Sequence, residues 1–321
     1  MKIIMFIICA TAVCGAEPLT LKSTVPLPGV KGRFDHFAVD TNTHRIFIAA
    51  LGNNTLEIID GAAAKRLHTI TGLHKPTGVA FLPNRNQIVV ANGDDDTVKV
   101  FDGTHYGLVK NIIGLGDADN VRFDVNANRI YVGYGDGALS AIDAKTFEQL
   151  GSIKLKAHPE SFQLEQNGPR IFVNVPDARH VAVVDRDKRS VAATWPMEKF
   201  RANFPMTLDE TNHRLFVGCR QPARLVVLDT ERGITVADLA ISNDTDDLFF
   251  DADRKRLYIS CGEGFIDVVE SRGSDRYERV ARIPTRAGAR TCFFSSALRQ
   301  LHLAVPQRDG QDAEIRIYQP E

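Results

Sequence analysis

The stretch that decides the fold is Arg129-Ile130-Tyr131-Val132, because close variants of it recur along the chain at a nearly constant spacing. The seven copies are Arg45-Ile46-Phe47-Ile48, Gln87-Ile88-Val89-Val90, Arg129-Ile130-Tyr131-Val132, Arg170-Ile171-Phe172-Val173, Arg214-Leu215-Phe216-Val217, Arg256-Leu257-Tyr258-Ile259 and Gln300-Leu301-His302-Leu303. Their first residues lie 42, 42, 41, 44, 42 and 44 positions apart. Self-similarity with a period of about 20 to 50 residues indicates a solenoid, a propeller or another array of repeated units.

A second marker recurs with the same spacing of about 42 residues. It is an acidic residue at the end of the strand that follows each apolar run. These acids are Asp60, Asp102, Asp143, Asp185, Asp229 and Glu270, at separations of 42, 41, 42, 44 and 41. We expect them to cap turns rather than to bind metal, since they recur with the repeat and each precedes a turn. Two markers in step make a chance periodicity very improbable.

Each period contains the same order of local signals. An apolar run such as 37–39 is followed by the Asp- and Asn-rich segment 40–44, whose side chains favour a tight turn. After the second run, the hairpin signal Gly52-Asn53-Asn54 leads into the third strand, 55–59, and a more polar fourth strand, 66–70. Four antiparallel strands in about 42 residues make one propeller blade.

The two ends of the sequence complement each other. The seventh period provides strands near 292–294, 301–303 and 314–317, and the sequence then ends without a fourth strand. The segment 19–25, before the first period, reads as a strand with no partner of its own. Pairing it with the seventh period removes an exposed edge. We therefore predict an all-β, seven-bladed β-propeller with four antiparallel strands per blade, closed by the N-terminal strand.

The second period resembles the repeat of the YVTN-type bacterial propellers. The stretch Ile88-Val89-Val90-Ala91-Asn92-Gly93-Asp94-Asp95-Asp96-Thr97-Val98-Lys99-Val100-Phe101-Asp102 follows the order strand, Asn, short turn, Thr-Val, strand, Asp. The resemblance extends over residues 33–321 as repeats, but only this period keeps Asn at the position of Asn92. It implies the seven-bladed fold and leaves function open, because such propellers serve as binding platforms, surface proteins and enzyme-like domains.

Composition narrows the function class. Hydrophobic residues make up 44% of the 321 residues and charged residues 25%, as expected of a globular protein with a packed core. The net charge is -1, with no basic excess, so we expect no nucleic-acid binding.

The first 16 residues read as a cleavable signal peptide. Lys2 provides the positive charge near the N-terminus, and residues 3–13 form a short apolar segment. Cys14-Gly15-Ala16 then provides the small residues that precede a cleavage site. Lipid attachment at Cys14 is the less favoured alternative, because Val13 stands where a small residue is preferred. We expect a periplasmic or secreted protein with no transmembrane segment, whose single domain spans 17–321.

Alignment of the repeats also predicts a ligand site. The position two residues before the first apolar residue of each blade should surround one mouth of the central channel, and we call these seven residues the ring positions. They are Asp35, Thr77, Asp119, Glu160, Phe204, Asp246 and Arg290. With His36 and His74 nearby, we predict a ligand site made of Asp35, His36, His74, Asp119, Glu160, Asp246 and Arg290.

The four ring carboxylates allow three interpretations. They either cap strand starts around a water-filled mouth, bind a polar ligand without metal, or hold a divalent cation such as calcium, which prefers several oxygen ligands. In the last case the ligands would be Asp35, Asp119, Glu160 and Asp246. His36, His74 and His158 lie on different blades, and a histidine beside an acid is also a general acid–base pair.

The cysteines offer two alternatives. Cys219, Cys261 and Cys292 follow the signal segment, and an odd number leaves at least one thiol outside an intramolecular disulfide. Cys219 and Cys261 occupy the same register in adjacent blades, so they should not meet. Buried free thiols are favoured over a Cys261–Cys292 bridge.

Three functions follow from this site. The leading hypothesis is an exported binding platform that recognises a small polar ligand or a protein partner at the channel mouth. The alternative is a metal-dependent, lactonase-like hydrolase that uses the carboxylate ring. A quinoprotein-dehydrogenase-like subunit is weaker, since the sequence has a single tryptophan.

Overall fold

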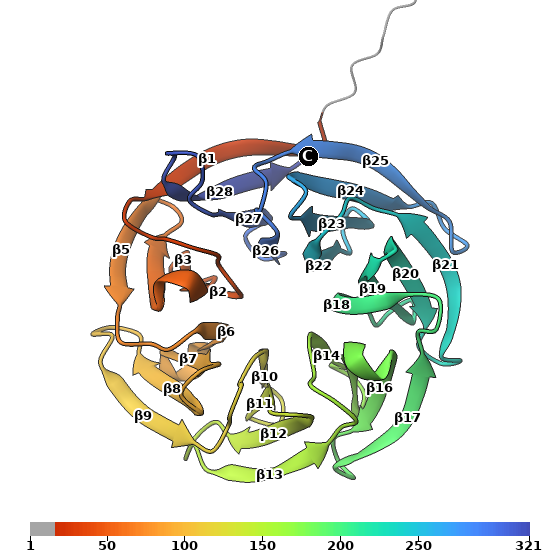
Figure 1. The fold of residues 1–321 in the computed structure, drawn as a ribbon, viewed down its shortest axis with the longest axis horizontal. Helices are drawn as coiled ribbons and strands as arrows, with labels where there is room; N and C mark the ends of the chain where they lie inside the picture. The colour runs from red at the N-terminus through yellow and green to blue at the C-terminus, as the bar shows by residue number, and fades with distance from the viewer. Residues whose placement is uncertain (1–16) are drawn as a thin grey trace, which may run out of the picture.

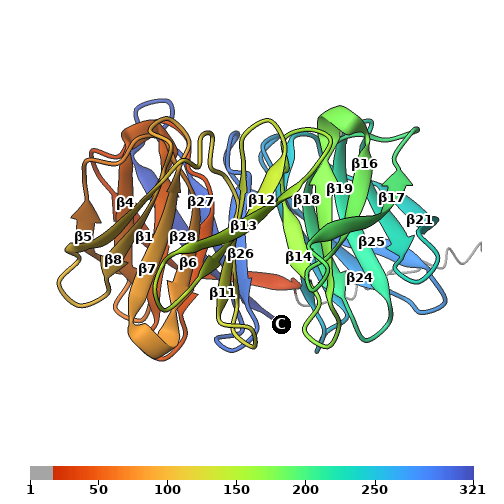
Figure 2. The same ribbon diagram turned by 90° about the horizontal axis from the view of Figure 1, so that it is seen from below.

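The computed structural model describes residues 17–321 and shows seven four-stranded antiparallel sheets arranged around a central axis (Figure 1). The signal peptide predicted at 1–16 lies outside the described residues. Seen from the side, the strands run between the two flat ends of a disc (Figure 2). The predicted all-β, seven-bladed propeller with four strands per blade is confirmed.

The strands take the same order in every blade, from the channel to the rim. The inner strands are β2 (Phe37–Asp40), β6 (Pro76–Leu82), β10 (Val121–Asp124), β14 (Phe162–Leu164), β18 (Arg201–Asp209), β22 (Thr245–Asp251) and β26 (Thr291–Ser295). The second strands are β3 (Arg45–Ala50), β7 (Gln87–Asn92), β11 (Arg129–Tyr134), β15 (Arg170–Val175), β19 (Arg214–Gln221), β23 (Arg256–Cys261) and β27 (Gln300–Val305).

The outer half of each blade is formed by the two strands that follow. The third strands are β4 (Thr55–Asp60), β8 (Thr97–Asp102), β12 (Ala138–Asp143), β16 (His180–Asp185), β20 (Ala223–Asp229), β24 (Phe265–Ser271) and β28 (Ala313–Pro320). The rim strands are β5 (Lys65–Ile70), β9 (Leu108–Ile113), β13 (Gln149–Lys154), β17 (Ser190–Pro196), β21 (Ile234–Ala240), β25 (Tyr277–Pro284) and β1 (Leu19–Leu27). The only helices in residues 17–321 are three 3-10 turns, η1 (Leu51–Asn53), η2 (Pro83–Arg85) and η3 (Pro176–Ala178).

The core lies between the blades. Side chains alternate across a strand, so Ile46 and Ile48 of β3 pack toward blade seven, while Phe47 packs toward blade two. The same division holds around the ring, and each of the seven hydrophobic clusters joins two adjacent blades. Because both faces of the second strand are buried, its sequence is an uninterrupted apolar run rather than an alternating one.

The recurring acids cap turns, as predicted. Asp60 accepts hydrogen bonds from the backbone N–H groups of Ala62 and Ala63 at 3.0 and 2.8 Å. The equivalent bonds form at Asp102, Asp143, Asp185 and Asp229. Glu270 differs, since its longer side chain pairs with Arg256 and Arg272 instead.

The ring closes through the N-terminal strand. β1 pairs antiparallel with β28 and becomes the rim strand of blade seven, which confirms the predicted closure. Leu19 packs in the cluster between blades six and seven, and Val25 and Leu27 pack in the cluster between blades seven and one. One short strand therefore contributes to both interfaces of the closing blade.

Cys219, Cys261 and Cys292 are buried and free, as favoured from the sequence. Burial raises the pKa of the Cys219 thiol to about 12, which makes it a poor nucleophile. Among residues 17–321, no helix has the length and apolar character needed to cross a membrane.

Two leucines on β1 provide a test of this closure. Leu27 is fully buried, so Leu27→Ala should lower the free energy of unfolding by about 2–5 kcal/mol. Leu21 is 47% exposed on the same strand, and Leu21→Ala should change it by less than about 0.5 kcal/mol. Urea unfolding of both variants measures the difference, and equal effects would contradict the role given to β1.

Candidate functional site

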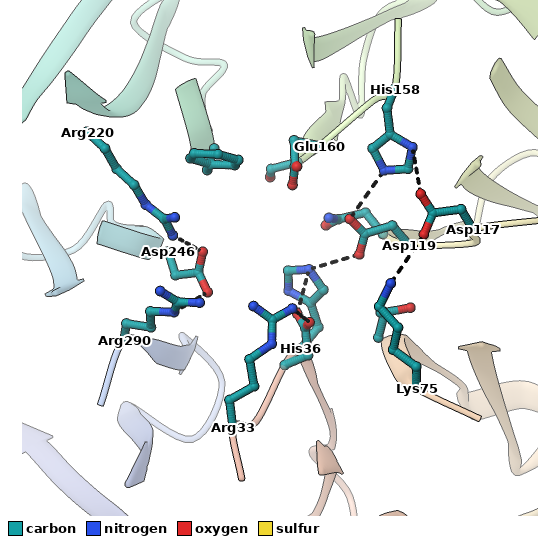
Figure 3. Close-up of a pocket in the computed structure, with 15 residues that line it drawn as sticks. Arg33, His36, Lys75, Asp117, Asp119, His158, Glu160, Arg220, Asp246 and Arg290 are labelled. Carbon is teal, nitrogen blue, oxygen red and sulfur yellow. Dashed lines mark hydrogen bonds and ion pairs between the residues drawn. The ribbon is translucent and has the colours of Figure 1, made fainter. Parts of the chain in front are cut away.

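All seven ring positions line one cavity of about 260 Å³ at a mouth of the channel. Asp35, Thr77, Asp119, Glu160, Phe204, Asp246 and Arg290 thus converge from seven blades, although they are spread over more than 250 residues of sequence. His36 and His158 also line this cavity, with the charged groups Arg33, Lys75, Asp117 and Arg220 (Figure 3).

The backbone directs the ring side chains inward in two ways. In blades one, three and four the ring residue lies two positions before the inner strand, where its N–H still bonds to the second strand: Asp119 N donates to Gly133 O at 2.9 Å. In blades two, five and six the inner strand itself contains a register shift at this level. A bulge bends the strand and redirects a side chain, so the irregularity serves the site.

Asp119 is held in place by blade two. The hydroxyl of Thr77 donates to Ala118 O at 2.8 Å, and Thr77 is itself buried. Gly78 passes directly against the backbone oxygen of Asp119, so any Cβ at Gly78 would collide with it. This close approach explains the glycine at a position where other blades have larger side chains.

One side of the mouth consists of paired arginines and aspartates. Asp246 lies between Arg220 and Arg290, and Arg290 Nε is 3.1 Å from Asp246 Oδ2 (Figure 3). Arg290 also donates to both oxygens of Asp244, at 2.8 and 2.9 Å. The guanidinium of Arg220 stacks 4.2 Å from the ring centre of Phe204. The charges on this side are largely compensated within the protein.

The other side of the mouth combines carboxylates with histidines. His158 Nε2 lies 3.8 Å from Asp119 Oδ2, and His158 Nδ1 is 2.7 Å from Gly135 O. His36 Nε2 lies 3.4 Å from Asp35 Oδ1 and 3.9 Å from Asp119 Oδ1. Asp119 is therefore the centre of this half, with a histidine on each side.

Glu160 and Asn120 present oxygen atoms with no partner. Among the described residues, the carboxylate of Glu160 makes no hydrogen bond or ion pair, and no dashed line reaches it in Figure 3. Asn120, 1% exposed, lines the same cavity, and its Oδ1 also has no hydrogen-bond partner in residues 17–321. Leaving a buried acceptor unsatisfied costs about 1–3 kcal/mol, so a ligand that donates hydrogen bonds is favoured here.

The carboxylates repel one another. Burial, followed by the charges of Asp119 and Asp246, raises the pKa of Asp35 well above its usual range. Burial and then the charge of Asp119 raise the pKa of Glu160 to about 8. For Asp119 itself, burial acts against ionisation, but contact with His158 and His36 outweighs it and lowers the pKa. Negative charge at neutral pH is therefore concentrated on Asp119.

Within residues 17–321, two sets of three side chains could hold a metal ion, and both include Asp119. One set is Asp35, His36 and Asp119, and the other is Asp119, His158 and Glu160, with the ligand atoms of each within 4.8 Å of one another. The expected set of four carboxylates is not formed, because Asp246 lies with the arginines and histidines take part instead. Imidazole suits zinc and similar metals better than it suits calcium.

Two residues depart from the sequence-based site. His74 does not line the cavity: its side chain is exposed, and the adjacent Lys75 reaches inward, 3.5 Å from Asp117 Oδ1. Arg220 lines the mouth but was not predicted. It follows the second strand's apolar run, at a position that is Gly in three other blades and Pro in two. A charged residue at this one position was the sequence feature that could have indicated Arg220 as part of the site.

Comparisons with known proteins identify the fold alone. No family model and no curated protein matches the sequence. A chain in the crystal structure of the mitotic checkpoint complex superposes with a TM-score of 0.79 over 99% of this chain and 98% of its own, at 13% identity. A chain of Kuenenia stuttgartiensis hydrazine synthase superposes with a TM-score of 0.75 over 87% of this chain and 95% of its own, at 17% identity. Both are similar to this chain as propellers.

The coupling of Asp119 to its neighbours is testable by NMR. Contact with Asp119 raises the pKa of His158 from 6.5 to about 9, so Asp119→Asn should shift the His158 titration back toward 6.5. The pKa of Glu160 should fall too, since the Asp119 charge helps raise it. His302, whose pKa burial lowers to about 4, lies inside blade seven and should be unaffected. His158 still titrating near 9 in the variant would contradict the assignment.

The same pair affects stability in a defined pH range. Because the pKa of His158 is raised by folding, the pair stabilises the protein fully below about pH 6.5, and this contribution is lost as the pH rises through 9. Thermal unfolding from pH 6 to 10 should therefore show a smaller decline in Asp119→Asn than in the unchanged protein.

Proposed function

We propose that this protein is an exported binding platform that recognises a small polar ligand at the channel mouth, with a positively charged or hydrogen-bond-donating group of the ligand among Asp35, Asp119 and Glu160. The observation that carries the proposal is the unpaired carboxylate of Glu160, in the cavity that Asn120, with its unpaired Oδ1, also lines. Both are acceptors, and both line a cavity that converging blades have built.

Charge distribution supports a cationic group on the ligand. The carboxylates Asp35 and Glu160 have raised pKa values, because burial and the neighbouring acids outweigh nearby positive charge, which for Asp35 comes from Arg33 at 3.3 Å. The arginines on the opposite side pair with Asp244 and Asp246 instead. A bound cation would favour ionisation of both acids. Export is part of the proposal and rests on the signal-like segment 1–16, and the YVTN-type repeat around Asn92 is consistent with a bacterial binding platform.

One specific observation favours the second candidate, a metal-dependent hydrolase of the lactonase-like type. Asp119 belongs to both potential metal-binding sets, one with His36 and one with His158. A divalent cation held by either set would polarise a carbonyl oxygen and lower the pKa of a bound water. Asp119 would bind the ion in both cases, and with the set of Asp35, His36 and Asp119 the Glu160 carboxyl would stay free to hold or accept a proton.

Small organic cations test the leading proposal. Putrescine, choline and glucosamine are suitable probes, and a probe present at 100 times its dissociation constant should stabilise the folded protein by about 2.7 kcal/mol. Glu160→Gln keeps the shape but removes the charge, and should weaken binding about tenfold or more. Glu148→Gln, on an exposed turn of blade three, is the matched control. Isothermal titration calorimetry measures each, and equal affinity for both variants would refute the role of Glu160.

Chelation tests the second candidate. If the mouth holds a tightly bound ion, EDTA should lower the thermal midpoint, and add-back of zinc, calcium or magnesium should restore it for one ion. Asp119→Asn should abolish that rescue, whereas Asp94→Asn, at a 65% exposed side chain, should not. A rescued midpoint leads to a screen of lactones and esters. An unchanged midpoint would contradict a tightly bound metal and favour the binding platform. The search for its ligand would then include partner proteins.

A further inference from the structure

A second cavity, of about 390 Å³, lies along the inner strands of the same channel. His36 lines both cavities, so the second begins where the mouth ends, and we call it the inner chamber. Its walls come from β2, β6, β10, β22 and β26, together with Gln163 of β14. Its volume falls within the range of about 300–1,000 Å³ that is usual for small-molecule sites.

The inner chamber differs chemically from the mouth because aromatic side chains line it. Phe81, Phe123, Phe249 and Phe293 all contribute, and each stays partly exposed rather than packing fully between blades. Phe249 and Phe293 meet edge to face, with ring centres 5.3 Å apart. The polar groups His36, Arg122, Gln163 and Asp247 lie beside these rings. Aromatic surface next to a few placed polar groups is the usual composition of a small-molecule pocket.

One cation faces this apolar chamber without a counter-charge. Arg122, on β10, donates to the backbone oxygen of Val121 at 2.9 Å, and its guanidinium lies 5.5 Å from the ring centre of Phe162. Among the described residues, no carboxylate oxygen lies within 4.0 Å of it. The arginines of the mouth differ, since Arg33, Arg220 and Arg290 each pair with an aspartate.

The acid that lines the chamber, Asp247, forms no ion pair with Arg122. Asp247 accepts a hydrogen bond from the backbone N–H of Cys292 at 3.0 Å, and its other oxygen lies 3.8 Å from His36 Nδ1. Asp247 and Asp119 act on Arg122 only from beyond ion-pair distance, and Asp119 is already in contact with His158 and His36. The guanidinium therefore retains its donors for a ligand.

We propose that the inner chamber binds a small organic carboxylate with an aromatic or branched aliphatic body. The carboxylate lies against Arg122, whose planar guanidinium matches it with parallel hydrogen bonds. The apolar body lies among Phe81, Phe123, Phe249 and Phe293. This site is separate from the cation-binding mouth, and it holds whether or not the mouth binds the ligand proposed above.

A matched pair of probes tests the proposal on the unchanged protein. Phenylacetate and phenylacetamide have the same shape and differ in charge, and calorimetry should show the carboxylate binding about tenfold more tightly or better. The preference should weaken as salt is raised, although less than at an exposed site. Equal affinity of the two probes, or no binding of either at millimolar concentration, would overturn the proposal without any variant being made.

Variants then test which residues bind the carboxylate of the ligand and which bind its apolar body. Arg122→Gln should remove the preference for phenylacetate while leaving phenylacetamide binding unchanged, and Arg122→Lys should retain part of it. Phe249→Leu should weaken both probes about equally. Arg220→Gln alters only the mouth and should leave both affinities unchanged. If Arg220→Gln removed phenylacetate binding and Arg122→Gln did not, the carboxylate site would lie at the mouth and the proposal would be wrong.

Discussion

The pairing of β1 with β28 is the constraint on which the rest of this structure depends. A propeller has no central core: its apolar side chains are buried only where one blade meets the next, so an open ring would leave two faces exposed to water. β1 completes blade seven and places Leu19 and Val25 in its two interfaces. Closure also brings blade one against blade six across the channel, where His36 Nδ1 lies 3.8 Å from Asp247 Oδ1.

The closed ring presents two environments along one channel. Residues just before the inner strands, or at the register shifts within them, form the polar mouth, while residues further along those strands form the phenylalanine-lined chamber. His36 is the boundary, since it is the first residue after the ring position Asp35 and lines both cavities. The difference follows from the backbone: the mouth is built from loops and bulges that tolerate charged side chains, and the chamber from regular strands.

The proposed recognition at the mouth rests on an asymmetric distribution of charge. A propeller repeats its backbone but not its side chains, and the ring changes from acids in blades one, three, four and six to Phe204 and Arg290 in blades five and seven. Arg220 and Arg290 therefore neutralise Asp246 on one side, whereas Asp35, Asp119 and Glu160 lie together on the other with His36 and His158, and Arg33 pairs only with Asp35. Charge is unbalanced across a few ångströms, which favours a ligand that is itself polar and asymmetric.

The sequence by itself determined the number of blades, the four strands in each, the closing strand and the ring positions. These follow from spacing, because a 42-residue step repeats both the buried strand around Ile130 and the turn acid Asp143. Only the tertiary structure decided how the ring residues are grouped. In the folded protein, Lys75 rather than His74 points into the mouth. Asp246 pairs with Arg220 and Arg290, whereas Arg122 has no ion-pair partner among the described residues. Register fixes the height of a side chain along the channel, whereas its direction depends on local bulges and on charges supplied by other blades.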